Sequence, residues 1–207
     1  MGANGKEDQL RLGFLTAVEV PEKGYVGGLL VTTHNGRPLE FQCTVPVKPN
    51  ATQEILYGPT LEPFILGELI GGTLLDKAGI KPHLILTDRL QILELRNHTQ
   101  SPVAYVSAGA TGGKAATPPI PQPVASAESI AAAVHQAQQV AEVQPEAGNG
   151  GEVRLGRQWI RFHGSHAGDA QTVQQESHHI PADADLCEPF ERVREALLET
   201  LRCGALR

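Results

Sequence analysis

Hydrophobic and polar positions along the first quarter of the chain follow a pattern typical of β-strands. Residues 12–20, 25–33 and 39–47 are each rich in apolar and β-branched side chains. Pro21 ends the first run, and Asn35-Gly36, between the second and third, is the signature of a tight hairpin. Strands joined by connections this short lie side by side, so residues 11–47 predict a three-stranded antiparallel meander.

The hydrophobic period then changes to that of a helix. Residues 52–78 carry apolar side chains three and four positions apart, and we expect Gly58-Pro59 and Gly71-Gly72 to break or kink the helix. Residues 84–86 predict a short strand, residues 89–96 one or two helical turns, and residues 102–107 another strand. This alternation predicts an α/β fold.

Residues 109–151 interrupt this pattern. They hold eleven Ala, six Gly and five Pro, and no Leu, Phe, Tyr or Trp. Such a segment buries too little apolar surface to offset the entropy lost on ordering its backbone. We expect it to be a disordered insert or linker.

The pattern resumes after the insert. Residues 152–162 predict a strand or a hairpin around Gly156, and Asp185 is placed to cap a final helix. That helix repeats apolar side chains at intervals of three and four: Phe190, Val193, Leu197 and Leu201. We therefore expect a disordered N-terminus (1–10), an α/β core (11–108), the insert (109–151), and a C-terminal part (152–207) whose helix packs on the core.

Two short stretches strengthen the resemblance of this chain to a known family. They are Asn-Ala-Thr-Gln-Glu-Ile-Leu at 50–56 and Leu-Ile-Leu-Thr-Asp-Arg-Leu-Gln-Ile at 84–92. With the order of strands and helices, they resemble the ribonuclease H-like superfamily over residues 11–108. The resemblance implies metal-binding carboxylates at Glu54 and Asp88. The family also places an Asp near the middle of the first strand, where this chain has none, and Glu19 is the only acid in that strand.

The resemblance implies a specific chemistry for these carboxylates. If Glu19, Glu54 and Asp88 converge, they can hold two divalent cations, Mg²⁺ or Mn²⁺, that cleave a phosphodiester. The alternative interpretation is that they are surface acids, with Glu54 and Asp88 stabilising helix N-termini.

Histidines form the other candidate metal site. His163 and His166 lie in a Gly-rich stretch, followed by His178, His179 and Cys187, and neutral imidazoles are good metal ligands. The spacing matches no established zinc motif, so a mobile polar loop is the competing interpretation.

Charge and cysteine content limit the possible partners. The net charge is −6, with Lys plus Arg against Asp plus Glu at 9 to 11, 1 to 3 and 7 to 9 in residues 1–108, 109–151 and 152–207. No segment has the basic excess of a dedicated nucleic-acid binder. Three widely spaced cysteines, a polar N-terminus and the absence of a long apolar run favour a cytoplasmic protein.

Two functions follow from these patterns. The main hypothesis is a non-catalytic interaction module with a protein partner, and the alternative is a divalent-metal-dependent nuclease or phosphodiesterase. Nucleic acid is a possible partner that the overall charge does not favour. The single basic and aromatic patch, Trp159 and Phe162 beside Arg157 and Arg161, either stacks on a base or covers an edge of the sheet.

Overall fold

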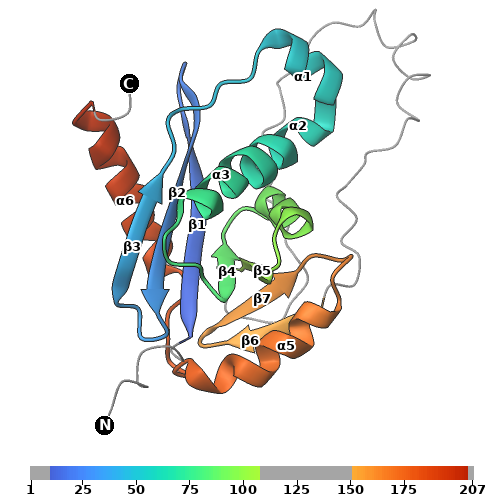
Figure 1. The fold of residues 1–207 in the computed structure, drawn as a ribbon, viewed down its shortest axis with the longest axis vertical. Helices are drawn as coiled ribbons and strands as arrows, with labels where there is room; N and C mark the ends of the chain where they lie inside the picture. The colour runs from blue at the N-terminus through green and yellow to red at the C-terminus, as the bar shows by residue number, and fades with distance from the viewer. Residues whose placement is uncertain (1–9, 108–150, 205–207) are drawn as a thin grey trace, which may run out of the picture. The chain divides into compact units, whose positions relative to one another are not determined.

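The computed structural model describes residues 10–107 and 151–204, which all belong to one compact unit. The predicted insert (109–151) and N-terminus (1–10) lie almost entirely outside these ranges. The described residues build one seven-stranded sheet with helical segments on both faces (Figure 1).

The sheet begins with the predicted meander of β1 (Arg11–Val20), β2 (Gly24–Thr33) and β3 (Pro38–Cys43). β4 (Leu84–Thr87) and β5 (Val103–Val106) lie parallel to β1, and a hairpin of β6 (Glu152–Leu155) and β7 (Gln158–Phe162) extends the sheet past β5. The order is β3-β2-β1-β4-β5-β7-β6. The predicted α/β class is confirmed, and so is the predicted order of a meander, a helical segment, a parallel strand, a helix, a strand and a closing C-terminal helix.

Alternation along the interior strand β1 separates two hydrophobic cores. Leu12 and Phe14 of β1 face one core, which is closed by α6 (Glu188–Arg202) and α5 (Gly168–Glu176). Leu15 and Ala17 face the other core, which is closed by η2 (Phe64–Gly71), α3 (Gly72–Lys77) and η3 (Leu90–His98). A residue's position in β1 therefore decides which helical layer it meets.

The predicted helix over 52–78 is present in several conformations. It comprises α1 (Ala51–Tyr57), η1 (Gly58–Thr60), α2 (Leu61–Pro63), the π-helix η2, and α3. Gly58, with a φ of 49°, ends α1 as predicted, but the chain stays helical through Gly71 and Gly72. Gly71 lies against η3, where an added Cβ would come within 3.0 Å of Leu95, so this glycine permits close packing rather than a break.

The last helix agrees with the sequence prediction except at its start. Phe190, Val193 and Leu197 are buried as predicted. The N-cap residue is Cys187, whose side chain makes no cap hydrogen bond, and Asp185 instead accepts a hydrogen bond from the Cys187 N–H at 2.8 Å. Asp185 therefore orders the turn before the helix.

In the described part of the chain, no helix is long and apolar enough to span a bilayer.

The edge strand β3 is held to the segment after α3 by one carboxylate. Glu40 accepts hydrogen bonds from the Gly79 N–H at 2.9 Å, the Ile80 N–H at 2.7 Å and the Gln42 amide at 2.8 Å. These bonds, the one from Gln42 first, lower the pKa of Glu40.

The lowered pKa predicts how acid acts on stability. A carboxyl whose pKa falls on folding stabilises the protein above its unfolded-state pKa, about 4.3, and loses that contribution as the pH falls through the folded-state value. In urea unfolding, we expect the wild type to be more stable than Glu40→Gln at neutral pH, and the difference to shrink below about pH 4. A difference that is the same at both pH values would show that the ionised carboxylate is not the stabilising group.

Candidate functional site

A polar cluster of Thr16, Asp88 and Arg194 lies at the carboxyl end of β4, where the resemblance noted in the sequence implies a carboxylate. Leu15 pairs with Thr87 where β1 and β4 run parallel, which brings the next residues, Thr16 and Asp88, together. The Thr16 hydroxyl donates a hydrogen bond to Asp88 Oδ1 at 2.6 Å. The Arg194 guanidinium, from α6, donates to Asp88 Oδ2. Both carboxylate oxygens therefore have partners within the fold.

The three groups differ in burial. Thr16 is 1% exposed and the Asp88 side chain is 17% exposed, so water competes little for this carboxylate. The Arg194 side chain is 42% exposed, and its charge lies beside Asp88 at the surface. Asp88 is thus flanked by a hydroxyl, which is a neutral and weak cation ligand, and by a guanidinium, which has no acceptor atom and repels a cation.

Glu19 does not join this cluster. Thr16 and Val18 face the core closed by α6, so Glu19, one residue further along a regular strand, points to the opposite face. Its neighbour across the sheet, Tyr25, packs on the other core and donates a hydrogen bond to Glu62 Oε1 at 3.2 Å. Burial and then Glu62 raise the pKa of Tyr25, with a smaller effect from Glu19. Glu19 therefore belongs to a different polar group.

Glu54 is an exposed residue in the first turn of α1, which has no buried residue. Asn50 and Gln53 form a capping box at this helix start, with the Gln53 N–H donating to Asn50 Oδ1 at 2.9 Å and the Asn50 N–H to Gln53 Oε1 at 3.0 Å. The turn that suggested a metal-binding Glu is thus a helix cap. Within residues 10–107 and 151–204, no three His, Cys, Asp or Glu side chains are placed to hold a metal ion. The predicted cluster of Glu19, Glu54 and Asp88 is not formed there.

His163 and His166 lie close to each other and contact residues of η3. The His163 and His166 rings lie 5.6 Å apart, His163 Nε2 is 3.6 Å from Glu94 Oε2, and His166 Nε2 is 3.0 Å from Asn97 Oδ1. These contacts attach the loop to η3, and the described residues complete no metal-ligand set around it. The structure thus gives both histidines partners in the adjacent layer, where the sequence suggested a metal site or a mobile loop.

The same region contains a buried ion pair that the sequence analysis missed. Asp169, which is 8% exposed, accepts hydrogen bonds from Arg96 Nε at 2.6 Å and Arg96 Nη2 at 3.0 Å. Arg96 also donates to the Thr99 carbonyl, and the hydrogen bond to Asp169 raises the pKa of its guanidinium. This two-bond contact fixes the start of α5 to the end of η3. The sequence signal for this helix was Asp169, an acid at the start of a Gln- and Thr-rich stretch.

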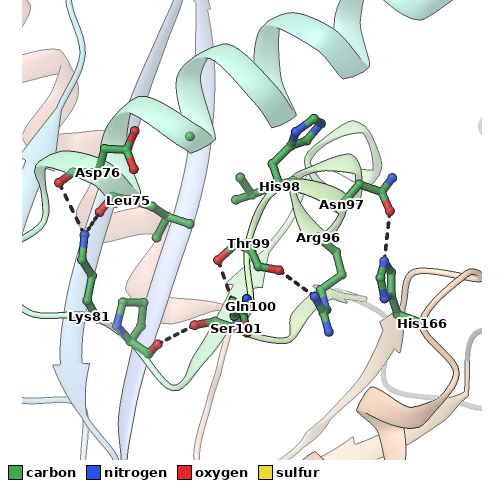
Figure 2. Close-up of a pocket in the computed structure, with 13 residues that line it drawn as sticks. Leu75, Asp76, Lys81, Arg96, Asn97, His98, Thr99, Gln100, Ser101 and His166 are labelled. Carbon is green, nitrogen blue, oxygen red and sulfur yellow. Dashed lines mark hydrogen bonds between the residues drawn. The ribbon is translucent and has the colours of Figure 1, made fainter.

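A large cavity lies beside this pair, with a volume of about 740 Å³ (Figure 2). Its lining includes Lys81, Arg96, His98 and His166. Most of these groups already have partners: Lys81 donates to the Leu75 and Asp76 carbonyls, Ser101 to the Pro82 carbonyl, and His166 pairs with Asn97.

The position of the cavity also separates it from Asp88. Its residues Lys81 and Pro82 precede β4, and Gln100 and Ser101 precede β5, so it lies at the amino ends of the parallel strands. Ligands of open α/β sheets bind at the carboxyl ends, where Asp88 is found. The cavity is therefore at the opposite end of the parallel strands from Asp88.

The fold and this cluster together define a class: an α/β domain in which the carboxylate that follows β4 is paired with an arginine of the last helix. Among solved structures, the catalytic domain of human endonuclease V is similar at 13% identity, covering 94% of this chain and 85% of that one, with a TM-score of 0.43. Endonuclease V of Ciona intestinalis, in a complex with a 23mer DNA containing an inosine, is similar at 13% identity, 93% and 87% coverage, and a TM-score of 0.41. The search of protein-family models gives no match, and the search of curated proteins gives none either.

Proposed function

We propose that this protein is a non-catalytic binding domain of ribonuclease H-like architecture. One observation carries the proposal: both oxygens of Asp88 are engaged by groups of the fold, Thr16 and Arg194. The acid that the family uses for a metal ion here serves as a link between β4, β1 and α6.

The donor set does not fit a pair of divalent cations. Such ions need several oxygen ligands that converge on one point and carry negative charge. Here the first strand offers the neutral hydroxyl of Thr16, Glu19 faces the other layer, and Glu54 is exposed on a short helix. Arg194 also places a positive charge against the single acid, which disfavours a cation there.

The metal-dependent nuclease remains the second candidate. Asp88 favours it, because this acid follows β4 at the carboxyl edge of the sheet beside β1, where α/β folds place ligands. That function requires Arg194 to turn away from Asp88 and further acidic ligands to reach it.

A cleavage assay distinguishes the two functions. The full chain is incubated with labelled single-stranded and duplex DNA and RNA in the presence of Mg²⁺ or Mn²⁺, beside an Asp88→Ala variant purified in the same way. We expect both proteins to leave every substrate intact. Cleavage by the wild type that Asp88→Ala abolishes would contradict the proposal and establish the nuclease.

A further inference from the structure

The β6–β7 hairpin and β5 present a surface of mixed aromatic and basic character. Alternate residues of the hairpin are buried in the core that α5 and α6 close: Val153, Leu155, Ile160 and Phe162. The residues between them point to the opposite side of the sheet. Phe162 therefore does not belong to the aromatic patch that the sequence suggested, whereas Trp159 does.

We call this outward side the hairpin face and define it by Tyr105, Arg154, Trp159 and Arg161. Trp159 is 38% exposed, Arg154 is exposed, the Arg161 side chain is 38% exposed, and Tyr105 is half-buried. In Figure 1 the hairpin forms the end of the sheet, and α5, whose Val173 packs in the core on the buried side, runs along it. A large aromatic side chain thus remains accessible on a rigid, paired strand.

The strand register places the two aromatic residues near each other. Tyr105 of β5 pairs with Arg161 of β7, and Ser107 lies opposite Trp159, with its N–H donating to the Trp159 carbonyl at 3.1 Å. Tyr105 and Trp159 are therefore diagonal neighbours on one face, about 7 to 8 Å apart at the backbone. Aromatic residues on adjacent strands are the arrangement by which some sheets stack successive bases of a single strand.

The charge of the hairpin complements an anionic ligand. Residues 152–162 hold three Arg and one acid, in a chain whose net charge is −6. Arg154 lies opposite Trp159 on the neighbouring strand, and Arg157 is exposed at the hairpin turn. The acid, Glu152, pairs with Arg161 at 3.1 Å, but both side chains are exposed, so this pair is weak and can exchange for a phosphate.

We propose that the hairpin face binds single-stranded nucleic acid, with bases stacked on Trp159 and Tyr105 and phosphates held by Arg154, Arg157 and Arg161. The inference names the ligand of the binding domain proposed above and rests on that proposal. A duplex is excluded as the ligand, because its paired bases hide the faces on which aromatic side chains stack. Stacking is tolerant of sequence, so we expect little preference among pyrimidine-rich strands.

The chain offers a direct probe of this site, because Trp159 is its one tryptophan. Oligothymidylate and oligouridylate of about 12 nucleotides, within the usual range of single-strand site sizes, are titrated into the full-length protein at about 50 mM salt. Intrinsic fluorescence reports on Trp159 itself, and the anisotropy of a labelled strand reports on total binding. The two strands distinguish a DNA ligand from an RNA ligand.

Variants separate stacking from charge. Trp159→Ala should weaken binding roughly 5- to 150-fold, as the loss of one stacked base does, while Trp159→Phe should retain most of it. Phe41→Ala, at an exposed aromatic residue of β3, is the matched control and should leave affinity unchanged. Arg154→Ala should reduce the slope of log affinity against log salt by about 1, whereas Arg202→Ala, exposed on α6, should not.

The outcomes are distinct. A duplex of the same length is titrated beside the single strands. Quenching of Trp159 fluorescence by the single strands, together with weaker binding of the duplex, supports the inference. It is overturned by absence of binding, by equal or tighter binding of the duplex, or by a rise in anisotropy with Trp159 fluorescence unchanged. Gel analysis of the same samples with Mg²⁺ tests the proposed function separately, since cleaved strands would contradict it and leave the stacking result standing.

Discussion

Replacing Asp169 by Asn should destabilise the protein by about 3 to 5 kcal/mol, the usual effect of removing one partner from a buried ion pair. The side chains of Arg96 and Asp169 are 16% and 11% exposed, so Arg96 would keep its charge in a site that water reaches poorly. At about 2 to 4 °C per kcal/mol for a chain of this size, the midpoint of thermal unfolding should fall by roughly 6 to 20 °C.

A double replacement distinguishes the ion pair from simple packing. Arg96→Met combined with Asp169→Leu removes both charges and keeps apolar volume, and such replacements are often neutral or stabilising. We expect the double variant to regain most of the lost stability. If it is as unstable as Asp169→Asn alone, then the contact between η3 and α5 depends on the hydrogen bonds of Arg96 rather than on charge balance.

Replacing Phe190 by Ala should cost a similar amount, about 3 to 5 kcal/mol, as expected for a large aromatic residue in a packed core. Phe190 is 2% exposed, and its ring meets that of Phe14 at 5.4 Å between centroids in an edge-to-face geometry. This contact holds α6 against β1 and so positions Arg194 at Asp88. Chemical unfolding measures the loss.

The control for this variant is an exposed residue of the same helix. Leu198→Ala also places an alanine in α6. Because Leu198 is 48% exposed, this variant removes less buried surface than Phe190→Ala. We expect a change within about 0.5 kcal/mol, as for ordinary surface positions. Equal losses for Phe190→Ala and Leu198→Ala would contradict the packing of α6 described above.

The strands and the last helix could be predicted because their signals are local. β1 and β2 are apolar and β-branched runs, an Asn-Gly turn joins β2 to β3, and α6 repeats apolar residues every three or four positions. Each of these patterns lies within a single strand, turn or helix, and tertiary contacts reinforce it. The order of elements could be predicted because the local sequence patterns and the tertiary contacts agree.

The helical layer on the other face was less predictable, because its conformation depends on distant contacts. η2 is a π-helix whose Gly67 lies against η3, where an added Cβ would be 3.1 Å from the Leu95 nitrogen. Gly71 likewise lies against η3, where an added Cβ would be 3.0 Å from Leu95, although the sequence predicted a break at Gly71-Gly72. α5 was missed because only Asp169 and Val173 are buried in it, which is too few positions to show a period.

In the candidate site, too, local features could be predicted from the sequence and distant contacts could not. The place of Asp88 at the end of a buried strand is a local feature, and it was predicted correctly. Its partner Arg194 lies 106 residues away in sequence, and no local pattern connects the two. The orientation of Glu19, in contrast, follows from alternation along β1, since Thr16 and Glu19 are three residues apart and therefore face opposite layers.

The central claim is that Asp88 serves the fold and does not hold a metal ion. Its most direct test is a thermal-unfolding titration with Mn²⁺ of the wild type, Asp88→Asn and the control Glu19→Gln. A ligand that binds only the folded state at 100 times its dissociation constant adds about 2.7 kcal/mol, or roughly 5 to 10 °C here. The account predicts that Mn²⁺ affects the unfolding midpoint of all three proteins equally. A saturable rise in the wild type and in Glu19→Gln that is absent from Asp88→Asn would contradict it.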